Sequence, residues 1–152
     1  MVNVTADQLR AELRAALTAN TDRMCDAIRV ELARGAVLEP RQRMQFEVDP
    51  FFYGIASCVS EEPVLAEDDW LDNSLPTDWR ERAEQALGGW DALVWEELCP
   101  WFAECWQAAG GPQRYSPAFM FFHDYHNDQY DLEGRRWLSG TELDEVWGGL
   151  DA

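Results

Sequence analysis

The densest group of residues that could do chemistry lies in a short polar segment near the C-terminus. It holds both histidines of the chain, three positions apart, among carboxylates and an amide. The candidate metal ligands are His123, His126, Asp128 and Asp131. Imidazole nitrogens with carboxylate oxygens suit zinc, manganese, iron or nickel. The spacing is neither H-E-x-x-H nor an EF-hand loop, and a hairpin loop is polar because it is solvated, so we expect no metal and no cofactor.

A nucleophilic cysteine is the second chemical possibility. Cys58 or Cys99 could be combined with His123 as a base and Asp124 as an orienting group. Both cysteines lie in apolar stretches, where burial keeps a thiol inert. The chain has no C-x-x-C pair and no glycine-rich phosphate loop. We therefore expect a protein that is not an enzyme, with small core side chains at Cys25, Cys58, Cys99 and Cys105.

Acidic residues greatly outnumber basic ones. The chain has 29 acids against 12 bases, all of them arginine, and a net charge of −17. The excess is uneven, because residues 1–45 carry a net +1 and residues 46–152 carry a net −18. Binding to nucleic acid or to an anionic membrane needs clustered Lys and Arg. The charge therefore argues against both partners, whereas it would attract a basic protein at long range.

The acid excess is concentrated in residues 60–97, where twelve acids stand against two arginines for a net charge of −10. Aromatic side chains ringed by charge serve as anchors in binding surfaces, and tryptophans lie in the same stretch. The predicted binding residues are Glu67, Asp68, Asp69, Trp70, Asp72 and Trp79. The alternative is that the carboxylates are a solvated surface and that the tryptophans shield the rim of a small core. Trp90 and Trp101 fit a helical stripe and are predicted to be core.

Helical periodicity dominates the N-terminal and middle segments. Apolar side chains recur at three-, four- and seven-residue steps from Leu9 to Leu32, which predicts one amphipathic helix over residues 6–33, started by a capping box at Thr5. A polar break at Asn20-Thr21-Asp22 could divide it. Further helices are predicted over residues 78–87, capped by Thr77, and over residues 90–99. A third helix or a kink is predicted to start at Pro100 and to run to Ala109, because proline removes a backbone hydrogen bond inside a helix.

Alternating and continuous apolar runs predict strands. Residues 44–48 alternate with the period of a half-buried strand, Asp49-Pro50 suits a turn, and residues 52–59 read as a central strand. Later strands are predicted over residues 118–122, 129–132 and 135–139, before a short helix that Ser139 or Thr141 caps and that runs through Trp147. Strands segregated from helices and joined by short turns indicate one α+β domain over residues 1–152 with a mostly antiparallel sheet.

Length and hydropathy bear on location. A chain of 152 residues matches one domain of ordinary size. Its apolar runs fall short of the roughly 18–20 residues that a membrane span needs. The first residues lack the basic region and apolar stretch of a secretory signal. We therefore expect a cytoplasmic protein.

Three runs resemble small bacterial immunity proteins that are encoded beside polymorphic toxins: residues 51–56 after the N-terminal helix, residues 90–95, and residues 121–125. The resemblance implies a non-enzymatic inhibitor that binds its toxin, and it transfers no functional residue. Our leading hypothesis is an acidic binding protein that inhibits a basic partner such as a nuclease toxin. The alternatives are a metal-dependent enzyme that uses the His123–Asp131 loop, and an accessory domain that oligomerises through its tryptophans.

Overall fold

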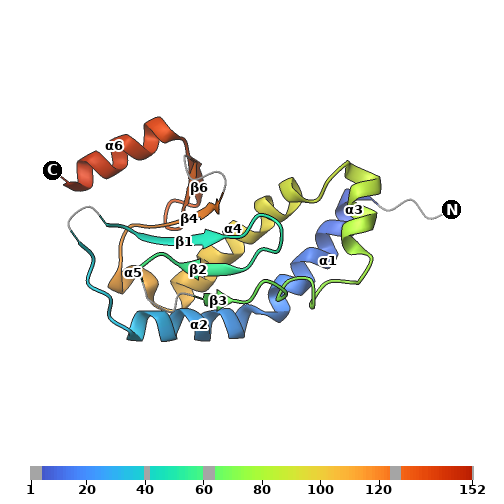
Figure 1. Ribbon diagram of the computed structural model, residues 1–152, viewed down its shortest axis with the longest axis horizontal. Helices are drawn as coiled ribbons and strands as arrows, with labels where there is room; N and C mark the ends of the chain where they lie inside the picture. Colours follow the sequence, from blue (N-terminus) through green and yellow to red (C-terminus); the bar gives the residue numbers. More distant parts are fainter. Residues whose placement is uncertain (1–4, 40–41, 60–63, 124–127, 152) are drawn as a thin grey trace.

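Six helices and six strands make up the described part of the chain (Figure 1). The computed structural model describes residues 5–39, 42–59, 64–123 and 128–151. In chain order the elements are α1 (Ala6–Ala19), α2 (Thr21–Ala33), β1 (Met44–Val48), β2 (Ile55–Ser57), β3 (Val64–Ala66), α3 (Trp79–Leu87), α4 (Asp91–Ala108), α5 (Gly111–Arg114), β4 (Ala118–Phe122), β5 (Gln129–Asp131), β6 (Arg136–Leu138) and α6 (Gly140–Asp151). Within these residues, no helix has both the length and the apolar character that crossing a bilayer requires.

The strands form one sheet in the order β3-β2-β1-β4-β5-β6. Neighbours are antiparallel except for the central pair, in which β1 and β4 run parallel from Met44 beside Ala118 to Val48 beside Phe122. A parallel pair needs a crossover connection, and the segment that holds α3, α4 and α5 provides it. The predicted α+β class with a mostly antiparallel sheet is confirmed.

The two faces of the sheet are covered unequally. On one face α4 crosses the strands (Figure 1), and its Phe102 and Trp106 contact Phe46 of β1 at ring distances of 5.0 and 5.4 Å. Helices α1 and α2 pack on α4 and complete the main core. Side chains alternate between the faces of a strand, so Phe119 of β4 points the other way, into a small cluster with Leu138 under α6.

The N-terminal segment is two helices rather than the predicted one over residues 6–33. The capping box at Thr5 is confirmed, because the Gln8 amide donates to the Thr5 hydroxyl at 3.2 Å. The division falls at Asn20, whose side-chain amide donates to the Ala16 carbonyl and to the Ser74 hydroxyl, both at 2.8 Å. Asparagine favours such local bonds over continued helix, so the polar break divides the segment.

Of the two alternatives at Pro100, a separate third helix is wrong, because α4 continues through Pro100 to Ala108. A proline inside a helix costs about 3 kcal/mol. The residues that follow it, Trp101, Phe102 and Trp106, are all buried, and burial of one large apolar side chain contributes about 1.5–3 kcal/mol. Keeping these side chains on one continuous helix therefore offsets the lost hydrogen bond.

Several shorter elements differ from the predictions. The strand expected over residues 52–59 is reduced to β2, because the Asp49 carboxylate accepts hydrogen bonds from the amides of Phe51 and Phe52 and widens the turn. Strand β3 lies in a stretch predicted as a loop. The N-cap of α3 is Asp78, not Thr77. Helix α6 extends past Trp147, and the hydroxyl of Ser139 accepts from the Glu142 amide at 3.5 Å, as expected of a cap.

Candidate functional site

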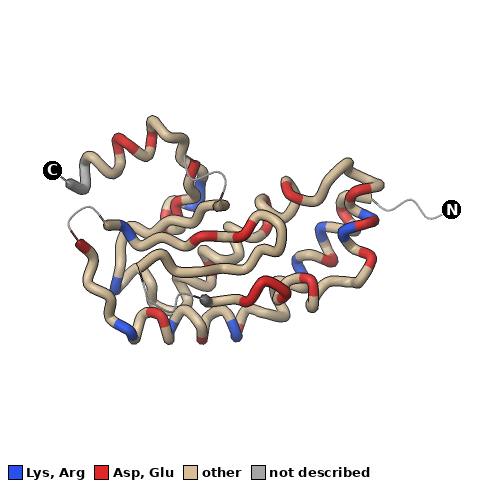
Figure 2. The backbone as a smooth tube through the Cα atoms, viewed as in Figure 1, with Lys and Arg blue, Asp and Glu red and all other residues tan. Residues whose placement is uncertain are grey.

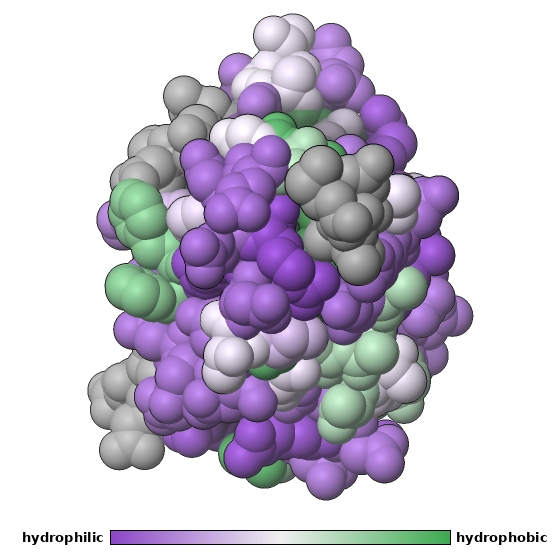
Figure 3. Space-filling view, turned by 90° about the vertical axis from the view of Figure 1, so that its right-hand side faces the viewer, coloured by the Kyte–Doolittle hydropathy of each residue, from purple (hydrophilic) through white to green (hydrophobic). Residues whose placement is uncertain are grey.

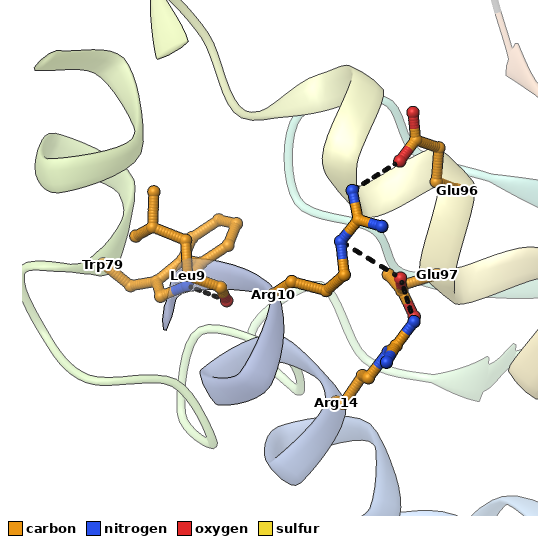
Figure 4. A network of polar contacts seen from close by, with 6 residues as sticks. All are labelled: Leu9, Arg10, Arg14, Trp79, Glu96 and Glu97. Atoms are coloured by element: carbon orange, nitrogen blue, oxygen red, sulfur yellow. Dashed lines mark hydrogen bonds and ion pairs between the residues drawn. The ribbon is translucent and has the colours of Figure 1, made fainter. Parts of the chain in front are cut away.

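Many acids of the predicted binding stretch are tied to arginines. Arg10 of α1 contacts Glu96 at 3.0 Å and Glu97 at 3.5 Å, and Arg14 contacts Glu97 at 2.7 Å (Figure 4). The Glu97 side chain is only 12% exposed. Its hydrogen bond and charge raise the pKa of Arg14. These carboxylates therefore hold α4 against α1, which leaves them little freedom to contact a partner.

Asp72 and Asp78, which precede α3 in the sequence, are paired with arginines in the same way. Asp72 meets Arg80 at 2.8 Å, and Arg82 bridges Glu12 at 3.0 Å and Asp78 at 3.2 Å. The Arg80 guanidinium also lies over the rings of Tyr53 and Trp90. Of the predicted binding residues, Asp72 is therefore part of the scaffold.

Glu67, Asp68 and Asp69, which we call the acidic turn, are exposed and follow β3 directly (Figure 2). Within the described chain, none of the three has an ion pair. Glu67 and Asp69 border a pocket of about 250 Å³ that is also lined by Met24, Leu65 and Trp70. Arg23 is the one cationic lining residue among those described. The acidic turn thus combines free carboxylates with a small hollow that is partly apolar.

Trp70 and Trp79 are core residues, contrary to their prediction as surface anchors. Trp70 is 5% exposed and donates its indole N–H to the Tyr53 carbonyl at 2.6 Å. Trp79 is 1% exposed and donates to the Leu9 carbonyl at 3.0 Å (Figure 4). A buried indole needs such an acceptor, and both rings find one on a neighbouring segment. Neither offers an exposed face to a partner.

The other tryptophans divide between core and surface. Trp101 is buried as predicted, whereas Trp90 is only partly buried. Trp106 is fully buried. Trp95 and Trp137 are partly exposed and line a hollow together with Asp128 and Glu142.

The predicted metal loop is only partly within the described residues, because His126 and Asp124 lie outside them. His123 places Nδ1 2.7 Å from a carboxylate oxygen of Glu47, on the neighbouring strand β1. Asp131 accepts the backbone amide of Glu133 in the turn that follows. Among the residues with a described position, no three His, Cys, Asp or Glu side chains are grouped as metal ligands.

The cysteines do not form a nucleophilic centre. Cys25, Cys99 and Cys105 are buried as predicted, but Cys58 is exposed, which corrects its assignment to the core. Partial loss of water around the sulfur and the charge of Glu47 raise the pKa of Cys58 to about 11. Burial raises the pKa of Cys99 as well. Both thiols are protonated at neutral pH and are poor nucleophiles.

A second hollow, which the sequence did not indicate, lies between α6 and the less covered face of the sheet. This α6 groove has a volume of about 520 Å³ and is lined mainly by Gln45, Glu47, Phe121, His123, Asp144 and Trp147. Gln45 donates its side-chain amide to Gln129 at 2.9 Å across β4. Alternation in β1 could have indicated that Gln45 and Glu47 share a face, but neither the packing of α6 over the sheet nor the parallel β1–β4 pair had a local signal.

No protein-family model, curated protein or solved structure matches the chain. The resemblance to immunity proteins stays a hypothesis. The candidate sites of the structure are the acidic turn and the α6 groove.

Proposed function

We propose that this is a non-enzymatic binding protein whose acidic turn docks a basic protein partner. The partner class we put first is a basic toxin such as a nuclease, which the protein would inhibit by covering it. The observation that carries the proposal is that Glu67, Asp68 and Asp69 are consecutive, exposed and without ion pairs within the described chain, whereas Asp72, Asp78, Glu96 and Glu97 are each paired with an arginine.

Electrostatics supports this use of the acidic turn. Three consecutive carboxylates on a chain of net charge −17 attract a cationic surface over a Debye length of about 8–10 Å. Such attraction mainly increases the association rate. Hydrophilic residues predominate on the end of the molecule formed by α3 and the start of α1 (Figure 3). The apolar residues on this end form small separate patches.

The adjoining pocket supplies a place for one side chain of the partner. Its apolar lining residues Met24 and Leu65 can contact the methylene groups of an arginine or lysine, while Glu67 and Asp69 at its edge pair with the charged end. Arg23 also lines the pocket, where the two carboxylates outnumber its single positive charge. The geometry therefore suits insertion of a single basic residue.

The test compares two variants of equal charge as baits for affinity capture from a lysate of the source cells. The first replaces the acidic turn with amides (Glu67→Gln, Asp68→Asn, Asp69→Asn). The matched control replaces three exposed acids elsewhere, Glu84, Glu104 and Glu145, with Gln. We expect a basic protein that the wild type and the control retain and the turn variant loses. Equal retention by all three baits would contradict the proposal.

A further inference from the structure

The α6 groove is a cavity with its own chemistry, at a different place from the acidic turn. Its volume of about 520 Å³ lies within the range of roughly 300–1,000 Å³ that is usual for ligand pockets. Phe121 and Trp147 supply aromatic walls, and Glu47 and Asp144 supply two carboxylates. None of its described lining residues is an arginine.

Its acceptors are only partly used. One oxygen of Glu47 contacts His123 Nδ1 at 2.7 Å, and within the described chain the second oxygen has no hydrogen bond. Asp144 is exposed and makes no ion pair with a described residue. Gln45 donates to Gln129 through its amide nitrogen, which leaves the Gln45 amide oxygen as a further acceptor. The groove thus offers several acceptors to a ligand that donates hydrogen bonds.

The walls of the groove are held in place by the surrounding structure. Arg43 donates to the Trp147 carbonyl at 3.2 Å, and its guanidinium lies 6.0 Å from the centre of the Trp147 ring. Arg43 is not a lining residue of the groove, and its hydrogen bond to the Trp147 carbonyl ties α6 to the residue before β1. The bond between Gln45 and Gln129 fixes the floor in the same way.

We propose that the α6 groove is a binding site for a guanidinium group. A guanidinium is planar and weakly hydrated, stacks on aromatic rings, and donates a fork of hydrogen bonds that matches a carboxylate. Carboxylates beside aromatic walls and an amide acceptor match each of these properties. An ammonium is a more strongly hydrated point charge and would use fewer of the acceptors. The site is independent of the proposed docking at the acidic turn.

The direct test is calorimetric titration with N-acetyl-arginine amide. The matched control ligand is N-acetyl-citrulline amide, which keeps the shape and removes the charge. We expect saturable binding of the arginine compound at one site and no measurable binding of the citrulline compound. Equal binding of the two, or no binding of either, would overturn the proposal.

Variants locate the binding in the groove. Glu47→Gln and Asp144→Asn each remove one charged acceptor, and each should weaken binding at least about tenfold, because each loses a hydrogen bond to a charged group. Glu145→Gln removes the same charge at an exposed neighbour on α6 that does not line the groove, and should bind like the wild type. Equal weakening by Glu145→Gln and Asp144→Asn would mean general charge attraction and would overturn the site.

A second measurement covers the case in which Glu47→Gln disturbs the fold. In ¹⁵N-labelled wild-type protein, the side-chain amides of Gln45 and Gln129 and the indole of Trp147 should shift with the arginine compound and stay unmoved with the citrulline compound. A Gly-Arg-Gly peptide then separates two sources of guanidinium. Tighter binding of the peptide assigns the groove to a partner's arginine, and equal binding assigns it to a small guanidinium ligand. Shifts confined to residues outside the groove would overturn the proposal.

Discussion

Two groups of acids in residues 60–97 differ in whether they pair with arginines. Glu96 and Glu97 lie on α4 against Arg10 and Arg14 of α1. The acidic turn lies about thirty positions earlier in the sequence and is exposed, with no ion pair inside the described chain. The difference shows that net charge alone does not identify a binding surface. The proposed docking therefore depends on carboxylates that the fold leaves without an arginine.

The comparison predicts that replacing a scaffold residue lowers stability, while replacing the acidic turn lowers binding. Trp79→Ala should have the largest effect. It removes a fully buried indole that joins α3 to α1 and leaves the Leu9 carbonyl without its donor. Truncation of a buried aromatic residue costs about 3–5 kcal/mol of unfolding free energy, measurable by urea denaturation. A loss below about 1 kcal/mol would mean that Trp79 is a surface residue after all.

Glu97→Gln should have a smaller effect that still separates the two groups of acids. It weakens contacts to Arg10 and Arg14 at a side chain that is largely buried, and the expected loss is about 1 kcal/mol. Glu96→Gln, at an exposed position with one partner, is the control and should cost a few tenths of a kcal/mol at most. Equal losses at the two positions would break the distinction between scaffold pairs and surface pairs.

The smallest of the predicted stability effects should be a pH dependence at the start of α6. Arg136 and Ser139 hold the pKa of Glu142 below its ordinary value of 4.5. Because the folded-state pKa is depressed, the stabilisation is present above 4.5 and is lost as the pH falls through the folded-state value. The melting temperatures of wild type and Glu142→Gln should therefore differ at pH 6 and converge in acid. A gap that stays constant with pH would show that the charge of Glu142 contributes nothing.

Local sequence patterns predicted the helices and strands, but they did not predict which elements pack against one another. The capping box at Thr5, the alternation over residues 44–48 and the apolar run over residues 118–122 each report the geometry of adjacent residues, and each is confirmed. Pairings between distant segments leave no such signal. Glu47 meets His123 across 76 positions, and Arg10 meets Glu96 across 86.

The candidate sites show the same limit. Exposure of Glu67, Asp68 and Asp69 agrees with their prediction, because a polar loop after a strand has few neighbours. The burial of Trp70 and Trp79 was missed, since an indole with a polar N–H suits either a surface or a core that offers a carbonyl acceptor. The packing of α3 on α1 decides this for Trp79, and the contact with the Tyr53 carbonyl decides it for Trp70.

The most direct test of the proposed function is the association rate of the captured partner across a salt series. Wild type, the three-amide turn variant and the Glu84/Glu104/Glu145 control should unfold within about 0.5 kcal/mol of one another, since all replaced residues are exposed. At low salt the turn variant should associate about tenfold more slowly than wild type, and the control should keep nearly the wild-type rate. The gap should close as salt screens the charges. Equal slowing in both variants would show that net charge, and not the acidic turn, attracts the partner.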